Sequence, residues 1–331
     1  MKIAVLGLGN WGFCLARQFA RNGHSVIGWT IEEGVLDLLR RGEDHPTLHR
    51  SSRGLPIEYA QTLEESVQEA DFILEAVTTK GLRSVLEKIK KTGSDKPIIL
   101  TSKGIEQKTF MPTPFVVLDV MGKEFEPRVC LLSGPSFAAE VVNQLPTAIV
   151  CGSWNLRLSE TIIRAVGSKS FRLYANSDIC GVALGGALKN IIAIACGIAD
   201  GLELGFGSRA SLVTRGLHEI VRLAVAQECK RETLYGLSGL GDLYLTCSSP
   251  ISRNFKFGRL LSTGLSLQEA EGQIGMVVEG AYTCRAAKEM AEKFGISMPI
   301  TEAVYDILSG TLPIKECVER LMLRSIKGEE E

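Results

Sequence analysis

The strongest chemical signal in this sequence is a lysine inside an apolar stretch. Lys189 lies in the run 181–199, which has helical spacing and in which Asn190 is the only other strongly polar residue. An unpaired ammonium group is costly to bury, so burial beside a second lysine would lower the pKa of Lys189 from about 10.4 towards neutral pH. Such a lysine can donate and accept a proton. The alternative is a lysine that extends to the surface or pairs with a carboxylate such as Asp242.

Two other charged residues fit proton chemistry at the same place. Lys103 follows the predicted strand 98–101, at the carboxyl edge where open α/β sheets bind ligands; otherwise it is an ordinary loop lysine. Asp242 follows a glycine-rich turn and can orient Lys189, and Thr246, one helical turn further on, faces the same way. An aspartate after glycines also caps helices, and both roles are compatible.

A polar group after Pro250 is suited to a phosphate. Ser252, Arg253 and Asn254 combine the planar donor fork of an arginine with two neutral side chains. The formal net charge of the chain is only -1, so an anionic substrate needs a local basic group of this kind. The alternative is a solvated surface arginine.

The N-terminus carries a glycine pattern typical of dinucleotide binding. Gly7, Gly9 and Gly12 form GLGNWG directly after an apolar run and at the start of a helical pattern. They permit a tight turn, the approach of a pyrophosphate and close helix–strand contact, while the helix N-terminus supplies free N–H groups. We therefore expect Asn10 and Trp11 at the cofactor, although Trp11 could instead only pack the first helix.

The choice between NAD and NADP depends on the residues after the second strand. Glu32 would accept a hydrogen bond from the ribose 2′-hydroxyl of NAD and would repel the 2′-phosphate of NADP, and no basic residue lies nearby. Alternatively, Glu32 and Glu33 only place negative charge on the first turn of the next helix. The prediction is NAD or NADP, with NAD favoured.

These residues need a framework, and the first half of the chain alternates strand-like and helical patterns. This alternation predicts βαβ units and a doubly wound sheet covered by helices on both faces. The predicted strands are 2–6, 25–29, 71–77, 98–101, 129–132, 147–151 and 171–174. The predicted helices are 11–22, 32–41, 62–69 and 81–91, and the polar segment 42–55 reads as a loop.

After the last predicted strand the chain reads as helical, with glycine and proline breaks that divide it into seven or eight helices. The fold class is thus α/β, an N-terminal Rossmann-type doubly wound sheet followed by an all-α domain. We expect a dinucleotide-binding domain at 1–175 and a helical substrate-binding and catalytic domain at 176–331. Residues 328–331 read as a solvated acidic tail.

Composition excludes several classes of protein. The near-neutral charge offers no electrostatic footprint for nucleic acid or an anionic membrane. The nine cysteines contain no CxxC pair and the four histidines no HExxH-type pair, so we expect no metal and a reducing, cytoplasmic compartment. Lys189 and Asn190 interrupt the longest apolar run at its middle, which argues against a membrane span.

Six segments in register resemble the NAD(P)-dependent glycerol-3-phosphate dehydrogenase family, over residues 2–322. They are LTSKGIE (100–106), LLSGPSFAAE (131–140), GGALKNIIAIACGIADGL (185–202), LSGLGDLYLTC (237–247), SRNFKFG (252–258) and GMVVEG (275–280). The resemblance implies reversible hydride transfer between NAD(P)H and dihydroxyacetone phosphate, which gives sn-glycerol 3-phosphate. It also implies a cytoplasmic homodimer in phospholipid-precursor metabolism.

The resemblance also assigns roles to residues. It makes Lys189 the proton donor and acceptor, with Lys103 and Asp242 as further catalytic residues. It places the substrate against Lys103, Gly134, Ser136, Lys189, Asn190, Asp242, Thr246, Ser252, Arg253 and Asn254. It places the cofactor against Gly7, Gly9, Asn10, Trp11, Gly12, Glu32, Lys103, Ala138, Arg253, Val277 and Glu279.

The chain departs from the family pattern in three places. Thr78 follows Val77 where a proline is common, the segment 51–55 differs, and Phe137 stands where histidine is frequent. Two rival functions remain. A 6-phosphogluconate-type β-hydroxyacid dehydrogenase would lack the GLGD and SRN segments, and a non-catalytic NAD-sensing module would have lost Lys189, Lys103 or Asp242.

Overall fold

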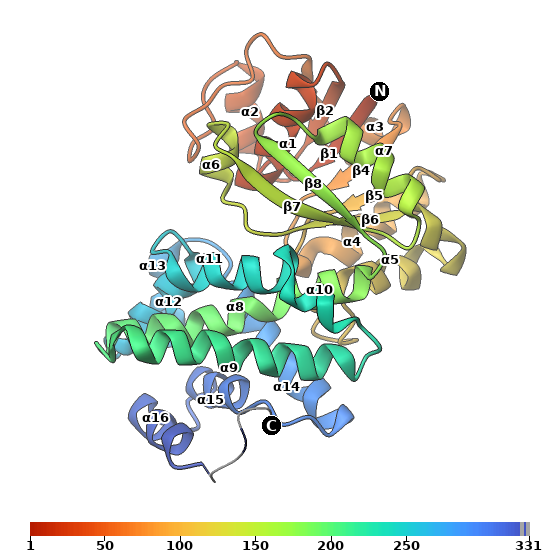
Figure 1. The fold of residues 1–331 in the computed structure, drawn as a ribbon. Helices are drawn as coiled ribbons and strands as arrows, with labels where there is room; N and C mark the ends of the chain where they lie inside the picture. Colours follow the sequence, from red (N-terminus) through yellow and green to blue (C-terminus); the bar gives the residue numbers. More distant parts are fainter. Residues whose placement is uncertain (325–327, 329–331) are drawn as a thin grey trace.

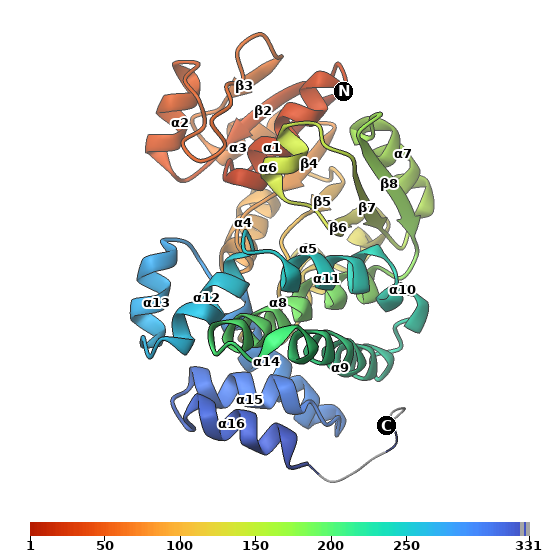
Figure 2. The same cartoon turned by 60° about the vertical axis from the view of Figure 1, so that its left-hand side comes forward.

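The computed structural model describes residues 1–324 and Gly328. The predicted acidic tail, apart from Gly328, lies outside the described residues. Figures 1 and 2 show a sheet with its covering helices, built from the first half of the chain, above a layer of helices built from the second half. The predicted fold class is confirmed.

The sheet has eight strands in the order β3-β2-β1-β4-β5-β6-β7-β8. Its two faces both carry apolar side chains: Ile3 and Val5 belong to one buried cluster, Ala4 and Leu6 to the other. This is the pattern of a sheet with helices on each side. The strands are β1 (Lys2–Leu6), β2 (Ser25–Trp29), β3 (Ile57–Tyr59), β4 (Phe72–Glu75), β5 (Ile98–Leu100), β6 (Val129–Ser133), β7 (Thr147–Gly152) and β8 (Phe171–Asn176).

Two details of the sheet differ from the prediction. β7 pairs antiparallel with β6, whereas every other pair is parallel. The connection from β6 to β7 contains only a five-residue helix. The chain therefore turns back beside β6 and runs in the opposite direction, instead of crossing over the sheet to start a parallel strand. The short edge strand β3 was not predicted, because three residues carry no readable period.

The helices around the sheet agree with the predicted ones to within two residues where a helix was predicted, and three others were missed. They are α1 (Asn10–Arg21), α2 (Glu33–Arg40), α3 (Leu63–Gln68), α4 (Thr79–Lys91) and the missed α5 (Thr113–Met121), α6 (Ala138–Val142) and α7 (Leu156–Val166), together with a 3-10 turn at Lys123–Arg128.

The second half contains nine α-helices within the described residues, more than the seven or eight predicted. The difference arises where a short helix, a π-helical turn and another short helix follow one another. The elements are α8 (Ile179–Gly201), α9 (Gly205–Val225), α10 (Arg231–Tyr235), the π turn η2 (Leu237–Gly241), α11 (Asp242–Ser248), α12 (Arg253–Ser262), α13 (Leu267–Ile274), α14 (Glu279–Phe294), α15 (Pro299–Leu308) and α16 (Ile314–Met322).

Helix α8 is the centre of the helical part. In the described chain it is the one helix long and apolar enough, by length and composition, to cross a membrane, and 89% of the qualifying window is buried inside the protein. Its first turns pack beneath the sheet and the rest lies in the core of the helical layer. Helix α8 is therefore a core helix that connects the sheet to the helical layer.

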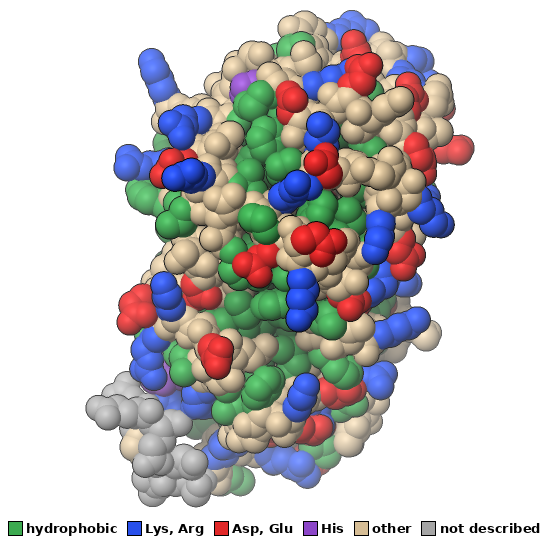
Figure 3. Space-filling model, turned by 90° about the vertical axis from the view of Figure 1, so that its right-hand side faces the viewer, with side chains coloured by type: hydrophobic (Ala, Val, Ile, Leu, Met, Phe, Trp, Pro, Cys, Tyr) green, Lys and Arg blue, Asp and Glu red, His purple; other side chains and the backbone are tan. Residues whose placement is uncertain are grey.

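The surface carries mixed charge. Figure 3 shows one face on which acidic and basic side chains alternate over apolar surface, without a broad area of one sign. This agrees with the formal net charge of -1.

Candidate active site

Lys189 lies near the middle of α8 and is 6% exposed. Its ammonium group donates to Asp242 Oδ1 and to Thr246 Oγ1, the latter at 2.8 Å. Both acceptors lie on α11, 53 and 57 residues further along the chain. Thr246 also donates to the backbone oxygen of Asp242, so the two acceptors are held together.

Lys103 reaches the same carboxylate from the sheet. Its Nζ lies 2.8 Å from Asp242 Oδ2 and 3.1 Å from the backbone oxygen of Gly134. Asp242 thus accepts one lysine on each oxygen and joins the carboxyl edge of the sheet to the helical layer. The capping role considered for Asp242 does not occur, because no side chain caps the N-terminus of α11.

The electrostatics of this group favour proton transfer. Burial and the charge of Lys103 lower the pKa of Lys189, whereas the charge of Asp242 and its hydrogen bond raise it, and the net pKa is about 8. A lysine whose pKa lies near the working pH exchanges a proton readily.

Glycines let two other elements approach α8 closely, one helical turn before Lys189. A Cβ on Gly186 would lie 2.7 Å from Ser133 Oγ, and one on Gly185 would lie 2.8 Å from the backbone oxygen of Ser238. The first contact brings β6 onto α8, and the second brings η2 onto α8. Both glycines precede Lys189 by one helical turn. Because they have no side chains, β6 and η2 can both pack closely against this face of α8.

A second polar group adjoins the first. Asn254 Nδ2 donates to Asn190 Oδ1 at 2.9 Å, and Asn254 Oδ1 accepts from the Gly280 N–H at 3.0 Å. These bonds join α8, α12 and α14. Asn190 follows Lys189 in the chain, and Glu279 precedes Gly280, so the two polar groups are contiguous.

Glu279, which precedes Gly280, is influenced by several charged residues of the site. Burial raises the pKa of its carboxyl, and Arg253, the Thr79 amide, Lys103 and Lys189 lower it. Arg253 itself is exposed at the start of α12. The guanidinium at 253 and the amine at 189 therefore act on the same carboxyl group, from α12 and α8 respectively.

Three predicted residues have clear local roles as well. Gly134 has φ +150° and a Cβ there would lie 2.8 Å from Ile149 Cα, so only glycine fits. Ser136 donates to the Gly134 oxygen at 3.1 Å, which shapes the turn after β6. Ser252 is buried and its hydroxyl caps α12 by accepting from the Phe255 N–H at 3.3 Å.

The glycine turn fits a dinucleotide. A Cβ on Gly7 would lie 2.6 Å from the Ala76 oxygen and one on Gly12 would collide with the Gly7 oxygen, whereas one on Gly9 meets nothing within 4 Å. Gly7 and Gly12 therefore make the turn, and Gly9 leaves the space before α1 open for a phosphate group. Trp11 Nε1 is buried there without a hydrogen-bond partner in the described chain.

The remaining predicted cofactor residues lie in loops and at helix starts. Thr47 donates from the 42–55 loop to Asn10 Oδ1. Glu32 is exposed between β2 and α2 and precedes α2 without capping it through its side chain. Ala138 begins α6, and Val277 is 38% exposed before α14.

Comparison with known proteins decides the family. The N-terminal model of the NAD-dependent glycerol-3-phosphate dehydrogenases matches residues 2–159, and the C-terminal model matches residues 178–319. This chain belongs to the NAD-dependent glycerol-3-phosphate dehydrogenase family.

Individual relatives agree with this assignment to the glycerol-3-phosphate dehydrogenase family. The chain is 50% identical to the NAD(P)+ glycerol-3-phosphate dehydrogenase of Protochlamydia amoebophila, over 99% of both chains. It is 44% identical to that of Chlamydia pneumoniae, over 99% of this chain and 98% of the relative. The crystal structure of glycerol-3-phosphate dehydrogenase from Coxiella burnetii superposes with a TM-score of 0.91 at 36% identity, over 98% of this chain and 99% of that one. The predicted resemblance is confirmed, and neither rival function is favoured.

Sequence reasoning missed several polar groups in this dehydrogenase. Thr79, Ser133 and Ser238 have buried hydroxyl groups without a hydrogen-bond partner in the described chain. Each of these residues borders the polar groups around Lys189 and Glu279. Glu75, the last residue of β4, is fully buried. The signal for Ser133 was its place before the GPS turn, and the signal for Glu75 was an acid at the end of an apolar strand.

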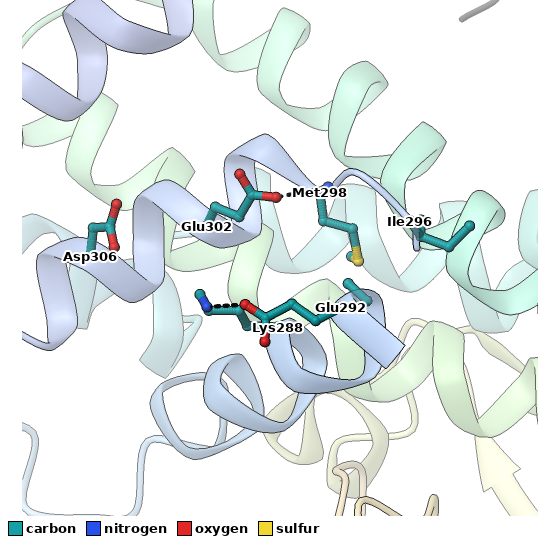
Figure 4. Close-up of a pocket in the computed structure, with 7 residues that line it drawn as sticks. Lys288, Glu292, Ile296, Met298, Glu302 and Asp306 are labelled. Atoms are coloured by element: carbon teal, nitrogen blue, oxygen red, sulfur yellow. Dashed lines mark hydrogen bonds and ion pairs between the residues drawn. The ribbon is translucent and has the colours of Figure 1, made fainter. Parts of the chain in front are cut away.

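A hollow elsewhere in the molecule has different chemistry. A cavity of about 270 Å³ lies between α14 and α15, and Figure 4 shows its lining residues. Lys288 there pairs with Glu292, and Glu302 accepts from the Met298 N–H at 3.3 Å. None of the predicted site residues lines it, and its one lysine is already paired with Glu292. The polar groups around Lys189 therefore make the better candidate.

Proposed function

We propose that this chain reduces dihydroxyacetone phosphate to sn-glycerol 3-phosphate with NAD(P)H, and catalyses the reverse reaction, with Lys189 as proton donor and acceptor. Membership of the glycerol-3-phosphate dehydrogenase family supports the overall reaction. The observation that carries the role of Lys189 is its burial between Asp242 and Thr246, beside Lys103.

The residues of the proposed site have different roles in the reaction. The nicotinamide cofactor, when bound, supplies or accepts the hydride at the carbonyl carbon. Lys189 gives its proton to the ketone oxygen during reduction and takes the proton back during oxidation. Asp242 orients Lys189 and favours its protonated form. Lys103 adds positive charge that stabilises the developing alkoxide.

The substrate phosphate needs a cation that water can reach. Arg253 is exposed at the N-terminus of α12, next to Asn254, whose side chain donates to Asn190, the neighbour of Lys189 in the chain. Its planar fork suits a phosphate. Asn190, Ser252 and Asn254 supply neutral hydrogen-bonding groups, while Gly134 and Ser136 leave room for a three-carbon molecule.

The cofactor is proposed to lie along the carboxyl edge of the sheet. Its pyrophosphate is expected at the GLGNWG turn, with NAD favoured over NADP because of Glu32. The proposed cofactor contacts are Gly7, Gly9, Asn10, Trp11, Gly12, Glu32, Lys103, Ala138, Arg253, Val277 and Glu279.

At the level of the whole chain, residues 1–175 are proposed to form the dinucleotide-binding domain and residues 176–331 the substrate-binding and catalytic domain. The change from sheet to helices between β8 and α8 supports this division. We further propose a soluble, cytoplasmic homodimer. Light scattering of the purified protein should give the mass of two chains, and the mass of a single chain would contradict the dimer.

A single assay tests the substrate, the cofactor and Lys189 together. Oxidation of NADH and of NADPH is measured with dihydroxyacetone phosphate for the wild type and for Lys189→Ala. We expect the variant to lose about 10²–10⁴-fold in kcat with nearly unchanged NADH binding. The control is Lys256→Ala, an exposed lysine on α12. A wild type that binds NADH without oxidising it would contradict the proposed function.

The role of Arg253 has its own test. Arg253→Ala should raise KM for dihydroxyacetone phosphate by about tenfold to a hundredfold, because one charged hydrogen-bonding partner is lost. Arg164→Ala, which removes an exposed arginine on α7, is the control. An unchanged KM in Arg253→Ala would exclude it as the phosphate ligand.

A further inference from the structure

Glu75 is a fully buried carboxylate at the end of β4, in the middle of the sheet. β4 lies between β1 and β5, so Glu75 stands at the point where the strand order reverses direction. Ligands of doubly wound folds bind in the crevice above that point. A buried charge there needs an explanation, because an apolar residue would cost nothing to bury.

Each oxygen of Glu75 accepts from a different loop. Oε1 accepts from the Val77 N–H at 2.8 Å. Oε2 accepts from the Ser102 hydroxyl at 3.0 Å and from the N–H groups of Thr101 and Ser102 at 3.4 and 3.5 Å. The carboxylate therefore joins the β4–α4 loop to the segment that follows β5.

Both segments lead directly to the proposed site. Lys103 follows Ser102 in the chain and pairs with Asp242. On the other side, Ala76 lies against the glycine turn, since a Cβ on Gly7 would meet its backbone oxygen at 2.6 Å. Glu75 accepts from donors in both segments, so its side chain fixes the two loop ends relative to each other.

We propose that Glu75 is a positioning residue that holds Lys103 at Asp242 by fixing the end of β5 against the β4–α4 loop. This inference rests on the proposed function. The path is direct: the carboxylate fixes Ser102, and Ser102 fixes the backbone from which the Lys103 side chain extends.

A double-mutant cycle in the full-length protein tests the path through Lys103. Glu75→Gln keeps the shape of the side chain but places an amide NH₂ against the donors of one of the two loops. We expect Glu75→Gln to lower kcat/KM for dihydroxyacetone phosphate at least tenfold, with NADH binding changed less than twofold. In the Lys103→Met background the same change should have less than a threefold effect, because the positioned group is gone.

Two further variants separate positioning from general destabilisation. Glu219→Gln is the matched control: Glu219 is a buried carboxylate on α9 that accepts three bonds from Ile300 and Thr301, away from the site. It should lower the melting temperature without lowering kcat/KM. If Glu75→Gln does not fold, Ser102→Ala removes only the hydroxyl bond and should show a smaller loss that also disappears in Lys103→Met.

The outcomes are distinct. Suppose that the wild type is active and that Glu75→Gln lowers kcat/KM by the same factor with Lys103 present and in the Lys103→Met background. This result, or the same result with Ser102→Ala in its place, would overturn the positioning role alone. Unchanged kinetics in that variant would do the same. A wild type inactive with dihydroxyacetone phosphate would overturn the proposed function and the positioning role with it.

Discussion

At the scale of single residues, the environment of Lys189 is a balance of opposing charges. Burial and the neighbouring Lys103 favour the neutral amine, whereas Asp242 favours the ammonium ion, and the resulting pKa is about 8. Asp242 is shared between the two lysines. Changes at Lys103 and at Asp242 should therefore move the pKa of Lys189 in opposite directions.

This balance predicts the pH dependence of catalysis. Reduction needs the protonated lysine, so kcat/KM for reduction should fall as pH rises through about 8, and the oxidation rate should rise over the same range. Asp242→Asn removes a cause that raises the pKa and should shift both limbs to lower pH. Lys103→Met removes a cause that lowers it and should shift them to higher pH. Profiles of kcat/KM against pH check this, and shifts of the same sign in both variants would contradict it.

At the scale of elements, close packing of two helices sets the site. Gly197 on α8 and Gly258 on α12 face each other's backbones, since a Cβ on either would collide with a carbonyl oxygen of the other helix, that of Phe255 or of Ile194. This contact brings the N-terminus of α12, with Asn254, against Asn190. Without glycine at the crossing, the helices would have to separate.

The crossing predicts a large effect from one methyl group. Gly258→Ala should lower the free energy of unfolding by about 1–3 kcal/mol through overpacking, and should raise KM for dihydroxyacetone phosphate because α12 moves. Gly34→Ala on α2 is the control: its added Cβ meets nothing within 4 Å, and alanine favours the helix by about 1 kcal/mol. Thermal unfolding and steady-state kinetics measure both. Equal stability of the two variants would contradict the tight crossing.

At the scale of the whole molecule, buried carboxylates make stability depend on pH. Burial raises the pKa of Glu219 to about 7 from its usual 4.5, so the folded protein binds this proton more tightly than the unfolded chain does. The corresponding stability is fully present below pH 4.5 and is lost as pH rises through about 7. Glu75 contributes with the same sign.

A comparison of melting temperatures tests this dependence. Glu219→Gln should be less stable than the wild type, because its amide NH₂ replaces one of the two oxygens that accept from three donors at the start of α15. The difference should be larger at pH 5 than at pH 8 in matched buffers, since only the wild type loses its proton between them. A difference that grows with pH would show that Glu219 is already ionised at pH 5.

The sequence by itself determined what depends on neighbours in the chain. Strands apolar on both faces, helices with a regular apolar period and the glycines of the first turn each express local geometry, and they predicted the sheet and its first four helices. Family motifs predicted the remaining site residues without placing any of them in space.

Only the tertiary structure decided which of these residues meet. Lys103 and Asp242 are 139 residues apart and are joined by one carboxylate, and the antiparallel entry of β7 depends on a connection too short to cross the sheet. The role of Glu75 was likewise hidden, because an acid at the end of a strand shows its partners only when the loops on either side fold over it. Hydrogen bonds between distant segments leave no period in the sequence, and for that reason the geometry of the site needed the folded chain.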